Sequence, residues 1–238
     1  MTGTLPGTLW GIGVGPGDPE LMTLKAHRLI STARVVAYPA PDDGDSFARR
    51  IAAATIPEDA EEIPMIVPMR AERFPAQQVY ANAAERIAAH LDQGTDVAVL
   101  CEGDPFFYGS FMYLFGRLVE RYPVEVVPGV SSLTACAARL SAPLATRNDV
   151  LTVLPAPLDE AILKARLKDI DAAAILKVGR HFDKVRRVLR ELGLADKARY
   201  VEHATMASQK ILPLEQVAAG EAPYFSMILV HRRGEAWR

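Results

Sequence analysis

Residues 9–19 read LWGIGVGPGDP, an apolar run in which glycine occupies every second position from 11 to 17. Leu9–Val14 has the composition of a buried β-strand, and Leu21–Ser31 follows with apolar residues at helical spacing. A strand, a glycine-rich loop and a helix in this order form the repeating unit of α/β proteins, which bind ligands at such strand ends. The segment therefore predicts an α/β fold with a binding loop after its first strand.

The glycine-rich loop is similar to a dinucleotide-binding fingerprint but does not match it. Counted from Gly11, the third glycine position holds Pro16, and counted from Gly13 it holds Asp18. A carboxylate at position 18 would also repel a pyrophosphate at the start of the helix. Four glycines within seven residues instead allow the backbone to approach a ligand without phosphate, with a purely structural turn as the alternative.

The same alternation continues to the end of the chain. Strands are expected at 9–14, 35–38, 63–67, 96–101, 124–127, 151–154, 173–178, 198–201 and 225–231. Helices are expected at 21–31, 46–54, 77–93, 111–120, 131–140, 159–167 and 182–192. This order predicts sheets that contain parallel strands, with helices on their faces. One large doubly wound domain and two smaller α/β domains joined near Arg121–Pro123 both fit the pattern.

Two further loops join a strand to a helix. Cys101–Gly109 (CEGDPFFYG) follows the most apolar strand and combines a glycine with three consecutive aromatic residues. Its backbone can hold an amino-acid-like ligand, although a helix-capping turn with core aromatics fits the same residues. Pro128–Leu133 (PGVSSL) contains two serines that can cap a helix. Three loops of one kind favour a binding site at the strand ends.

Composition and charge exclude other classes of protein. Half of the 238 residues are hydrophobic, and 27 Lys and Arg against 29 Asp and Glu give a net charge of −2. Such a surface has no overall field that attracts nucleic acid or an anionic membrane. No stretch approaches 18 consecutive apolar residues, and the N-terminus lacks a signal-peptide pattern. Cys101 and Cys136 lie in apolar segments, so we expect buried thiols in a cytoplasmic protein.

The three loops resemble those of a known family. GIGVGPGDPELMTLKA, EGDPFFYGS and PGVSS, in this order and spacing, are similar to the motifs of the tetrapyrrole methylases. Those enzymes use S-adenosylmethionine in cobalamin and sirohaem synthesis. The similarity runs from Leu9 to about Arg232. It implies two αβα domains, here 1–122 and 123–238, with an active-site trough between them and usually a homodimer.

Within the family, four segments look most like the enzymes that methylate C20 of precorrin-2. They are LTVLPAPL (151–158), LKVGRH (176–181), VEHATMASQKI (201–211) and PYFSMILV (223–230). The resemblance implies methylation of precorrin-2 by S-adenosylmethionine, which gives precorrin-3A in cobalamin biosynthesis. The alternatives are the same methylation of a cobalt-containing precorrin-2, methylation of a macromolecule, and a non-catalytic sensor of an adenosine ligand.

The resemblance also gives the S-adenosylmethionine site, position by position. It implies that the first loop borders the ligand, the second lines its methionine end, the third adds two serines, and LKVG and EHAT flank the adenosine. The expected residues are Pro16, Glu102, Gly103, Asp104, Phe107, Ser131, Ser132, Val178 and Ala204. Many relatives have Gly in place of Glu102 and Thr-Ala in place of Ser131-Ser132, so backbone contacts are expected to carry the binding.

Methyl transfer from a sulfonium is an in-line displacement that needs no metal, so no protein-bound metal is expected. Because positive charge leaves the sulfur, a nearby carboxylate would stabilise the ground state more than the transition state. The carboxylates of Glu102 and Asp104 are therefore expected near the ammonium end or within loop structure. Candidates for a base are Glu102, His203 and Tyr108. Candidate partners of substrate carboxylates are Arg147, Lys177, Arg180 and Lys210, and no catalytic residue is assigned.

Overall fold

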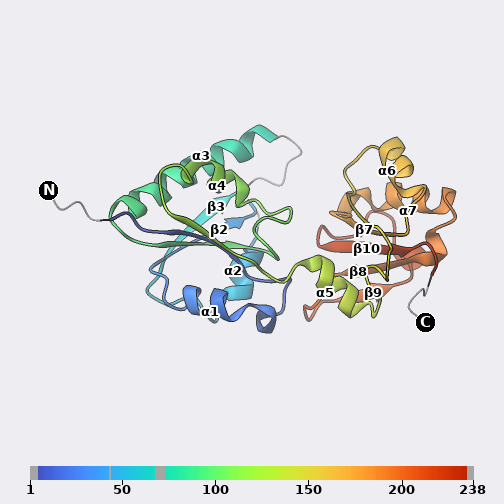
Figure 1. The fold of residues 1–238 in the computed structure, drawn as a ribbon, viewed down its shortest axis with the longest axis horizontal. Coiled ribbons are helices and arrows are strands. Elements are labelled where there is room, and N and C mark those ends of the chain that lie inside the picture. The colour runs from blue at the N-terminus through green and yellow to red at the C-terminus, as the bar shows by residue number, and fades with distance from the viewer. Residues whose placement is uncertain (1–4, 43, 68–72, 235–238) are drawn as a thin grey trace. The chain divides into compact units, whose positions relative to one another are not determined.

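The computed structural model of the chain describes residues 5–42, 44–67 and 73–234 (Figure 1). They form two compact units, Met1–Ser131 and Ser132–Arg238, each built around its own five-stranded sheet. The expected α/β fold with two sheets is confirmed. The expected division after residue 122 came too early, because β5 (Val124–Val127) pairs with β1 (Leu9–Gly13) and completes the first sheet.

The first unit contains a fully parallel sheet in the order β3-β2-β4-β1-β5. Its other strands are β2 (Val35–Ala40), β3 (Glu61–Ile66) and β4 (Val97–Cys101). Helices α1 (Leu24–Ile30) and α2 (Phe47–Ala52) lie on one face, and α3 (Arg73–Asp92) and α4 (Met112–Leu118) lie on the other (Figure 1). Since all neighbours are parallel, every strand ends at the same edge of the sheet.

Burial on both faces explains why the central strands are apolar throughout. All five residues of β4 are buried, as parallel strands covered by helices require. On the face covered by α3 and α4, Val97 and Val99 pack with Ile87 and Leu91 in one apolar cluster. Truncating one of these large side chains to alanine would cost roughly 2–5 kcal/mol of stability.

The second unit contains a mixed sheet in the order β6-β7-β10-β8-β9. Its strands are β6 (Leu151–Pro155), β7 (Ala172–Leu176), β8 (Ala198–Glu202), β9 (Lys210–Leu212) and β10 (Ser226–His231). β6 and β7 are parallel, whereas β10 is antiparallel to both β7 and β8. β7 and β8 therefore run in the same direction, one strand apart. The helices are α5 (Ser132–Arg139), α6 (Glu160–Leu167) and α7 (Phe182–Glu191), and apolar residues of α6 and α7 share one core cluster with the sheet.

Local sequence signals set several element boundaries. Ser46 caps α2, because its Oγ accepts a hydrogen bond from the Arg49 amide at 3.2 Å. Gly94 follows α3 with a φ of +77°, a conformation that suits glycine. The expected end of β2 at Tyr38 was wrong, since the strand continues through Pro39 to Ala40. The pairing of β2 with β4 stops before Pro39, so only β3 pairs with β2 there.

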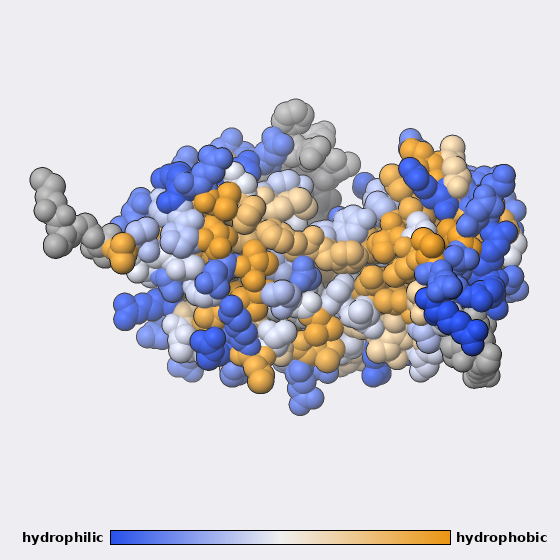
Figure 2. All heavy atoms as spheres, viewed as in Figure 1, coloured by the Kyte–Doolittle hydropathy of each residue, from blue (hydrophilic) through white to orange (hydrophobic). Residues whose placement is uncertain are grey.

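Both cysteines lie in the interior, as their apolar sequence surroundings predicted. Within the described ranges, no helix is long and apolar enough to cross a membrane. Cys101 and Cys136 are buried free thiols. Among the residues that the structure describes, no three His, Cys, Asp or Glu side chains gather as a metal site would require. Figure 2 shows apolar side chains exposed between charged ones on the viewed face of each unit.

Candidate active site

The three loops predicted to bind a ligand lie side by side in the first unit, except that Ser132 begins the second. They leave β4, β1 and β5, which are neighbours in the sheet. The first two loops form a β-bridge, in which the Gly103 amide donates to the Gly15 carbonyl at 2.8 Å and the Gly15 amide donates back at 3.3 Å. Sequence reasoning placed these loops at strand ends, and the parallel pairing of the sheet brings them together.

Glycines are required where the loops touch. A Cβ on Gly13 would lie 2.6 Å from the Gly103 carbonyl oxygen, and one on Gly129 would lie 1.9 Å from the same oxygen. Gly103 itself has a φ of +63°, which side chains disfavour. Three segments of main chain thus pack directly on each other, without side chains between them. This explains the glycine in each motif better than a single turn would.

Asp104 connects the second and third loops. Its Oδ1 accepts a hydrogen bond from the Phe106 amide at 2.9 Å, and its Oδ2 accepts one from the Gly129 amide at 3.1 Å. Both oxygens are therefore engaged by backbone within the first unit. The carboxylate therefore holds the second and third loops together.

The remaining expected residues follow one edge of the second sheet. Val178 comes two residues after β7 and Ala204 two residues after β8, and because these strands share a direction, both lie beyond the same edge. Both residues are buried. Lys177, His203 and Thr205 have φ values of +56°, +47° and +72° there. Non-glycine residues with positive φ are uncommon and cluster at functional sites.

A protein-family model matches most of the chain, including the three loops. The model described as Tetrapyrrole (Corrin/Porphyrin) Methylases covers residues 8–218. The chain belongs to this family. This methylase is 43% identical to a precorrin-2 C(20)-methyltransferase from Sinorhizobium sp., and the match covers 97% of each chain. It is 30% identical to a cobalt-precorrin-2 C(20)-methyltransferase from Salmonella typhimurium, with 96% of this chain and 98% of that one covered.

Two further matches concern chain length and ligand. The methylase is 44% identical to cobalamin biosynthesis protein CobIJ from Mycobacterium tuberculosis, and spans only about half of its length (46%). A solved structure of uroporphyrin-III C-methyl transferase from Thermus thermophilus, complexed with S-adenosyl homocysteine, matches with a TM-score of 0.67 and 26% identity. That match covers 94% of this chain and 97% of that one. The fold of the methylase is thus shared with an enzyme that holds the demethylated form of S-adenosylmethionine.

Glu102 of the methylase faces α2. The backbone amides of Ala48 and of Glu102 itself are hydrogen-bonded to its carboxylate and favour the charged form, but burial dominates and raises the pKa of the carboxyl. The side chain therefore links the loop after β4 to the helix that follows β2. Asp104 and Glu102 both have backbone amides of their own unit as partners.

The raised pKa of Glu102 predicts a pH-dependent effect of the Glu102→Gln substitution. A carboxyl whose pKa is raised by folding contributes stability below its unfolded pKa, near 4.3, and loses it as pH rises through the folded value. Glutamine keeps an acceptor for the Ala48 amide but has no charge to desolvate. We expect Glu102→Gln to raise the melting temperature more at pH 8 than at pH 4, as measured by calorimetry. An equal change at both pH values would contradict a desolvated carboxyl.

The aromatic segment divides between core and surface. Phe111 is buried against Gly11, where a Cβ would lie 2.4 Å from its ring. Phe106 is 53% exposed and packs edge-on against Phe115, with 5.2 Å between the centroids. Phe107 is partly buried and packs edge-on against the exposed Tyr108. The three consecutive aromatic residues therefore do not form one flat surface, since the rings of Phe107 and Tyr108 are inclined by 84° to each other.

A polar group that the sequence did not reveal joins β2, α2 and β3 through Tyr38, Arg49 and Glu62. Glu62 accepts hydrogen bonds from Arg49 Nε and Nη2 at 2.9 and 2.8 Å and from the Tyr38 hydroxyl at 2.5 Å. The Arg49 guanidinium lowers the pKa of Glu62, while burial raises that of Tyr38. A cavity of about 370 Å³ adjoins this group, lined by residues that include Tyr38, Ser46, Arg49, Arg50 and Pro64. It opens at the same edge of the sheet as the three loops.

Of the four cations expected to bind substrate carboxylates, three lie at the edge of the second sheet where β7 and β8 end, near Val178 and Ala204. Lys177 and Arg180 follow β7, and Lys210 begins β9 beside the end of β8. The Lys210 ammonium lies 3.1 Å from Glu202, whose carboxylate also accepts from the Tyr200 hydroxyl at 2.6 Å. The buried Glu202 carboxylate therefore holds the Lys210 ammonium near the end of β8.

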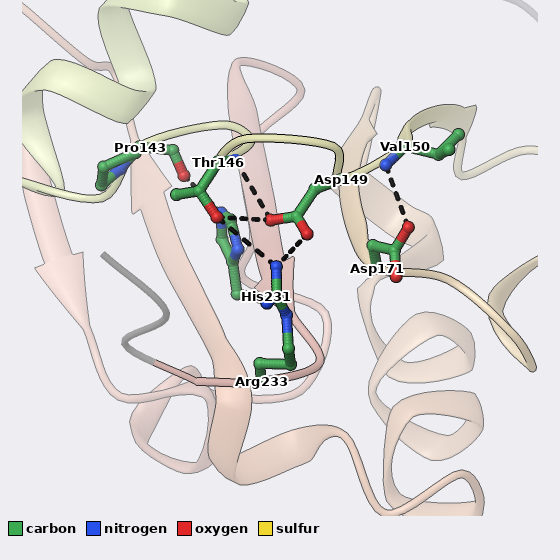
Figure 3. A network of polar contacts seen from close by, with 7 residues as sticks. All are labelled: Pro143, Thr146, Asp149, Val150, Asp171, His231 and Arg233. Atoms are coloured by element: carbon green, nitrogen blue, oxygen red, sulfur yellow. Dashed lines mark hydrogen bonds and ion pairs between the residues drawn. The ribbon is translucent and has the colours of Figure 1, made fainter. Parts of the chain in front are cut away.

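Arg147 lies elsewhere in the second unit, in the connection that leads into the start of β6. Figure 3 shows how this connection is held: Asp149 accepts from the Thr146 hydroxyl at 2.7 Å and pairs with Arg233, and His231 contacts the Pro143 carbonyl. Since β6 and β7 are parallel, this is the edge opposite to the one near Val178. Within its own unit, Arg147 is therefore not grouped with the other three cations.

Proposed function

We propose that this methylase transfers a methyl group from S-adenosylmethionine to C20 of precorrin-2 and so makes precorrin-3A in cobalamin biosynthesis. The observation that carries the proposal is the 43% identity with a precorrin-2 C(20)-methyltransferase over 97% of each chain. The four segments that resemble C20 enzymes support the same substrate. The acceptor is a small tetrapyrrole, and the net charge of −2 argues against nucleic acid as a substrate.

The packed glycines support S-adenosylmethionine as methyl donor. A Cβ at Gly13 or Gly129 would collide with the backbone of a neighbouring loop, so these glycines let the three loops meet and gather their backbone at one place. We infer that Pro16, Gly103 and Phe107 border the donor, and that Ser131, Ser132, Val178 and Ala204 complete its site. Bound S-adenosylmethionine supplies an electrophilic methyl group on a sulfonium.

The carboxylates of Glu102 and Asp104 are proposed to position the binding loops and not to contact the sulfonium. Glu102 and Asp104 have backbone amides as partners, so neither needs a sulfonium to satisfy its charge. Because the sulfur loses positive charge in the transition state, the absence of a carboxylate beside it favours methyl transfer. C20 of a reduced tetrapyrrole is enamine-like and already nucleophilic, so alignment and exclusion of water supply most of the acceleration. Lys177, Arg180 and Lys210 are proposed partners of the substrate's acetate and propionate groups.

A cobalt-containing precorrin-2 is the second candidate substrate. Its support is the relative from Salmonella typhimurium, which is 30% identical against 43% for the relative from Sinorhizobium sp.. In that case the macrocycle would hold the metal, and the protein would need no ligands for it. We further propose a homodimer in the cytoplasm, as the family resemblance implies and as two buried free thiols support.

Calorimetry tests the proposed donor. We expect S-adenosylhomocysteine to bind saturably and NAD to give no binding heat, because the first loop lacks the dinucleotide fingerprint and has Asp18 at the start of a 3₁₀ turn. The Asp18 carboxylate there accepts from the Glu20 amide at 2.9 Å, which occupies the position that a phosphate would need. Binding of NAD with no response to S-adenosylhomocysteine would contradict the proposal.

A further inference from the structure

The Gln209 side chain in the second unit joins two segments that are far apart in the chain. The Gln209 Oε1 accepts a hydrogen bond from the Thr205 amide at 2.9 Å and another from the Arg139 Nε at 2.8 Å. Both neighbours can only donate at these atoms, so they fix which end of the glutamine amide faces them. A single oxygen therefore connects α5 to the turn after β8.

Each joined segment carries residues proposed for the donor site. Arg139 is the last residue of α5, and Ser132 is its first. Thr205 follows Ala204 directly in the turn after β8. The interval from one end of α5 to the other is fixed by its helical geometry, roughly 1.5 Å per residue. Holding Arg139 to Thr205 thus sets the turn that contains Ala204 relative to α5.

The turn needs such support because its backbone is strained. Thr205 is β-branched and has a φ of +72°, and His203 has a φ of +47°. Such conformations persist only where surrounding contacts maintain them. The turn is also held by hydrogen bonds from the His203 amide to the Phe225 carbonyl at 2.8 Å and from the Met206 amide to the His203 carbonyl at 3.0 Å. The Gln209 side chain also ties it to α5.

We propose that Gln209 is a positioning residue for S-adenosylmethionine, holding the Ala204 turn in its binding conformation through Thr205 and Arg139. This inference rests on the proposed function, since it assigns Ala204 to the donor site. Gln209 itself need not touch the ligand. Its loss should weaken donor binding more than it slows the methyl transfer of bound substrates.

The test compares two substitutions of similar length. Gln209→Met removes the acceptor, and we expect S-adenosylhomocysteine to bind about five- to thirty-fold more weakly, with KM for the donor rising in parallel and kcat changing less. Gln209→Glu keeps oxygens that accept from both donors, and we expect affinity within about threefold of wild type. Gln216→Met, at an exposed position in the same unit, is the matched control and should leave affinity unchanged.

Wild-type affinity in Gln209→Met would overturn the inference, as would an equal loss in Gln209→Glu. If Gln209→Met fails to fold, Arg139→Met removes one of the two donors and should weaken binding in the same direction, so unchanged affinity there would also overturn it. Hydrogen exchange at the Thr205 amide provides a readout without ligand, and we expect it to be faster in Gln209→Met or Arg139→Met. Failure of the wild type to bind S-adenosylhomocysteine would contradict the proposed function, whereas unchanged exchange would contradict the role of Gln209.

Discussion

Substitution of Gly129 by alanine is expected to weaken the binding of S-adenosylhomocysteine by at least about 100-fold. The new Cβ would lie 1.9 Å from the Gly103 carbonyl oxygen and 2.8 Å from the Gly13 Cα. These are main-chain atoms, which cannot rotate away as a side chain could. The second and third loops must therefore separate, and the proposed donor site is built from their backbone.

Gly116→Ala is the matched control for this substitution. Gly116 is exposed within α4, and a Cβ there would meet no atom within 4 Å. Alanine is favoured over glycine inside a helix by about 1 kcal/mol, so this variant should be slightly more stable and bind normally. Calorimetric titration gives the affinities, and far-UV circular dichroism with thermal melting verifies the fold of both variants. Normal binding by folded Gly129→Ala would mean that the loop junction is not the donor site.

Removal of the Asp104 carboxylate should have the second-largest effect. Asp104→Ala leaves the half-buried Gly129 amide without its acceptor, at a cost of up to about 1–3 kcal/mol, while the exposed Phe106 amide can bond to water instead. Since the lost bond to Gly129 connects the second and third loops, we expect S-adenosylhomocysteine to bind about 10- to 100-fold more weakly. Asp104→Asn, which keeps one acceptor oxygen, should bind with intermediate affinity.

Asp96 offers a matched control at the opposite edge of the same sheet. Its carboxylate also accepts two hydrogen bonds, from the Thr8 amide at 2.7 Å and from Trp10 Nε1 at 3.3 Å. Asp96→Ala should lower the melting temperature without changing affinity for S-adenosylhomocysteine. Equal losses of affinity in both variants would show that the effect of Asp104 is general destabilisation, and would remove its special link to the site.

Local patterns in the sequence predicted much of the fold. The alternation of apolar runs with helical spacing predicted an α/β fold, the family resemblance favoured two domains over one, and Ser46 and Gly94 marked helix ends as expected. The direction of β10 was beyond reach, because a fully buried strand is apolar whether its neighbours are parallel or antiparallel. The three-residue β9 was missed because its side chains are mostly exposed. β5 was assigned to the second domain because strand pairing is not encoded within the strand itself.

The sequence located the three loops, because each is a continuous motif, but it did not reveal groups that several separate elements build together. Glycines in the three loops predicted close approach of the backbone to a ligand, and the structure shows close approach between the loops themselves, at Gly13, Gly103 and Gly129. The group of Tyr38, Arg49 and Glu62 assembles from three separate elements, so no local pattern announces it. Gln209 joins residues far apart in the chain, and only its side-chain hydrogen bonds reveal the connection.

The measurement that tests the proposed function most directly is NMR of the product formed with a carbon-13 methyl donor. With metal-free precorrin-2, we expect one labelled methyl group, attached to the meso carbon C20. Uroporphyrinogen III, whose meso bridges are saturated, should gain none. A label on a pyrrole-ring carbon would contradict the C20 assignment. Methyl transfer to the cobalt complex alone would contradict metal-free precorrin-2 as the substrate.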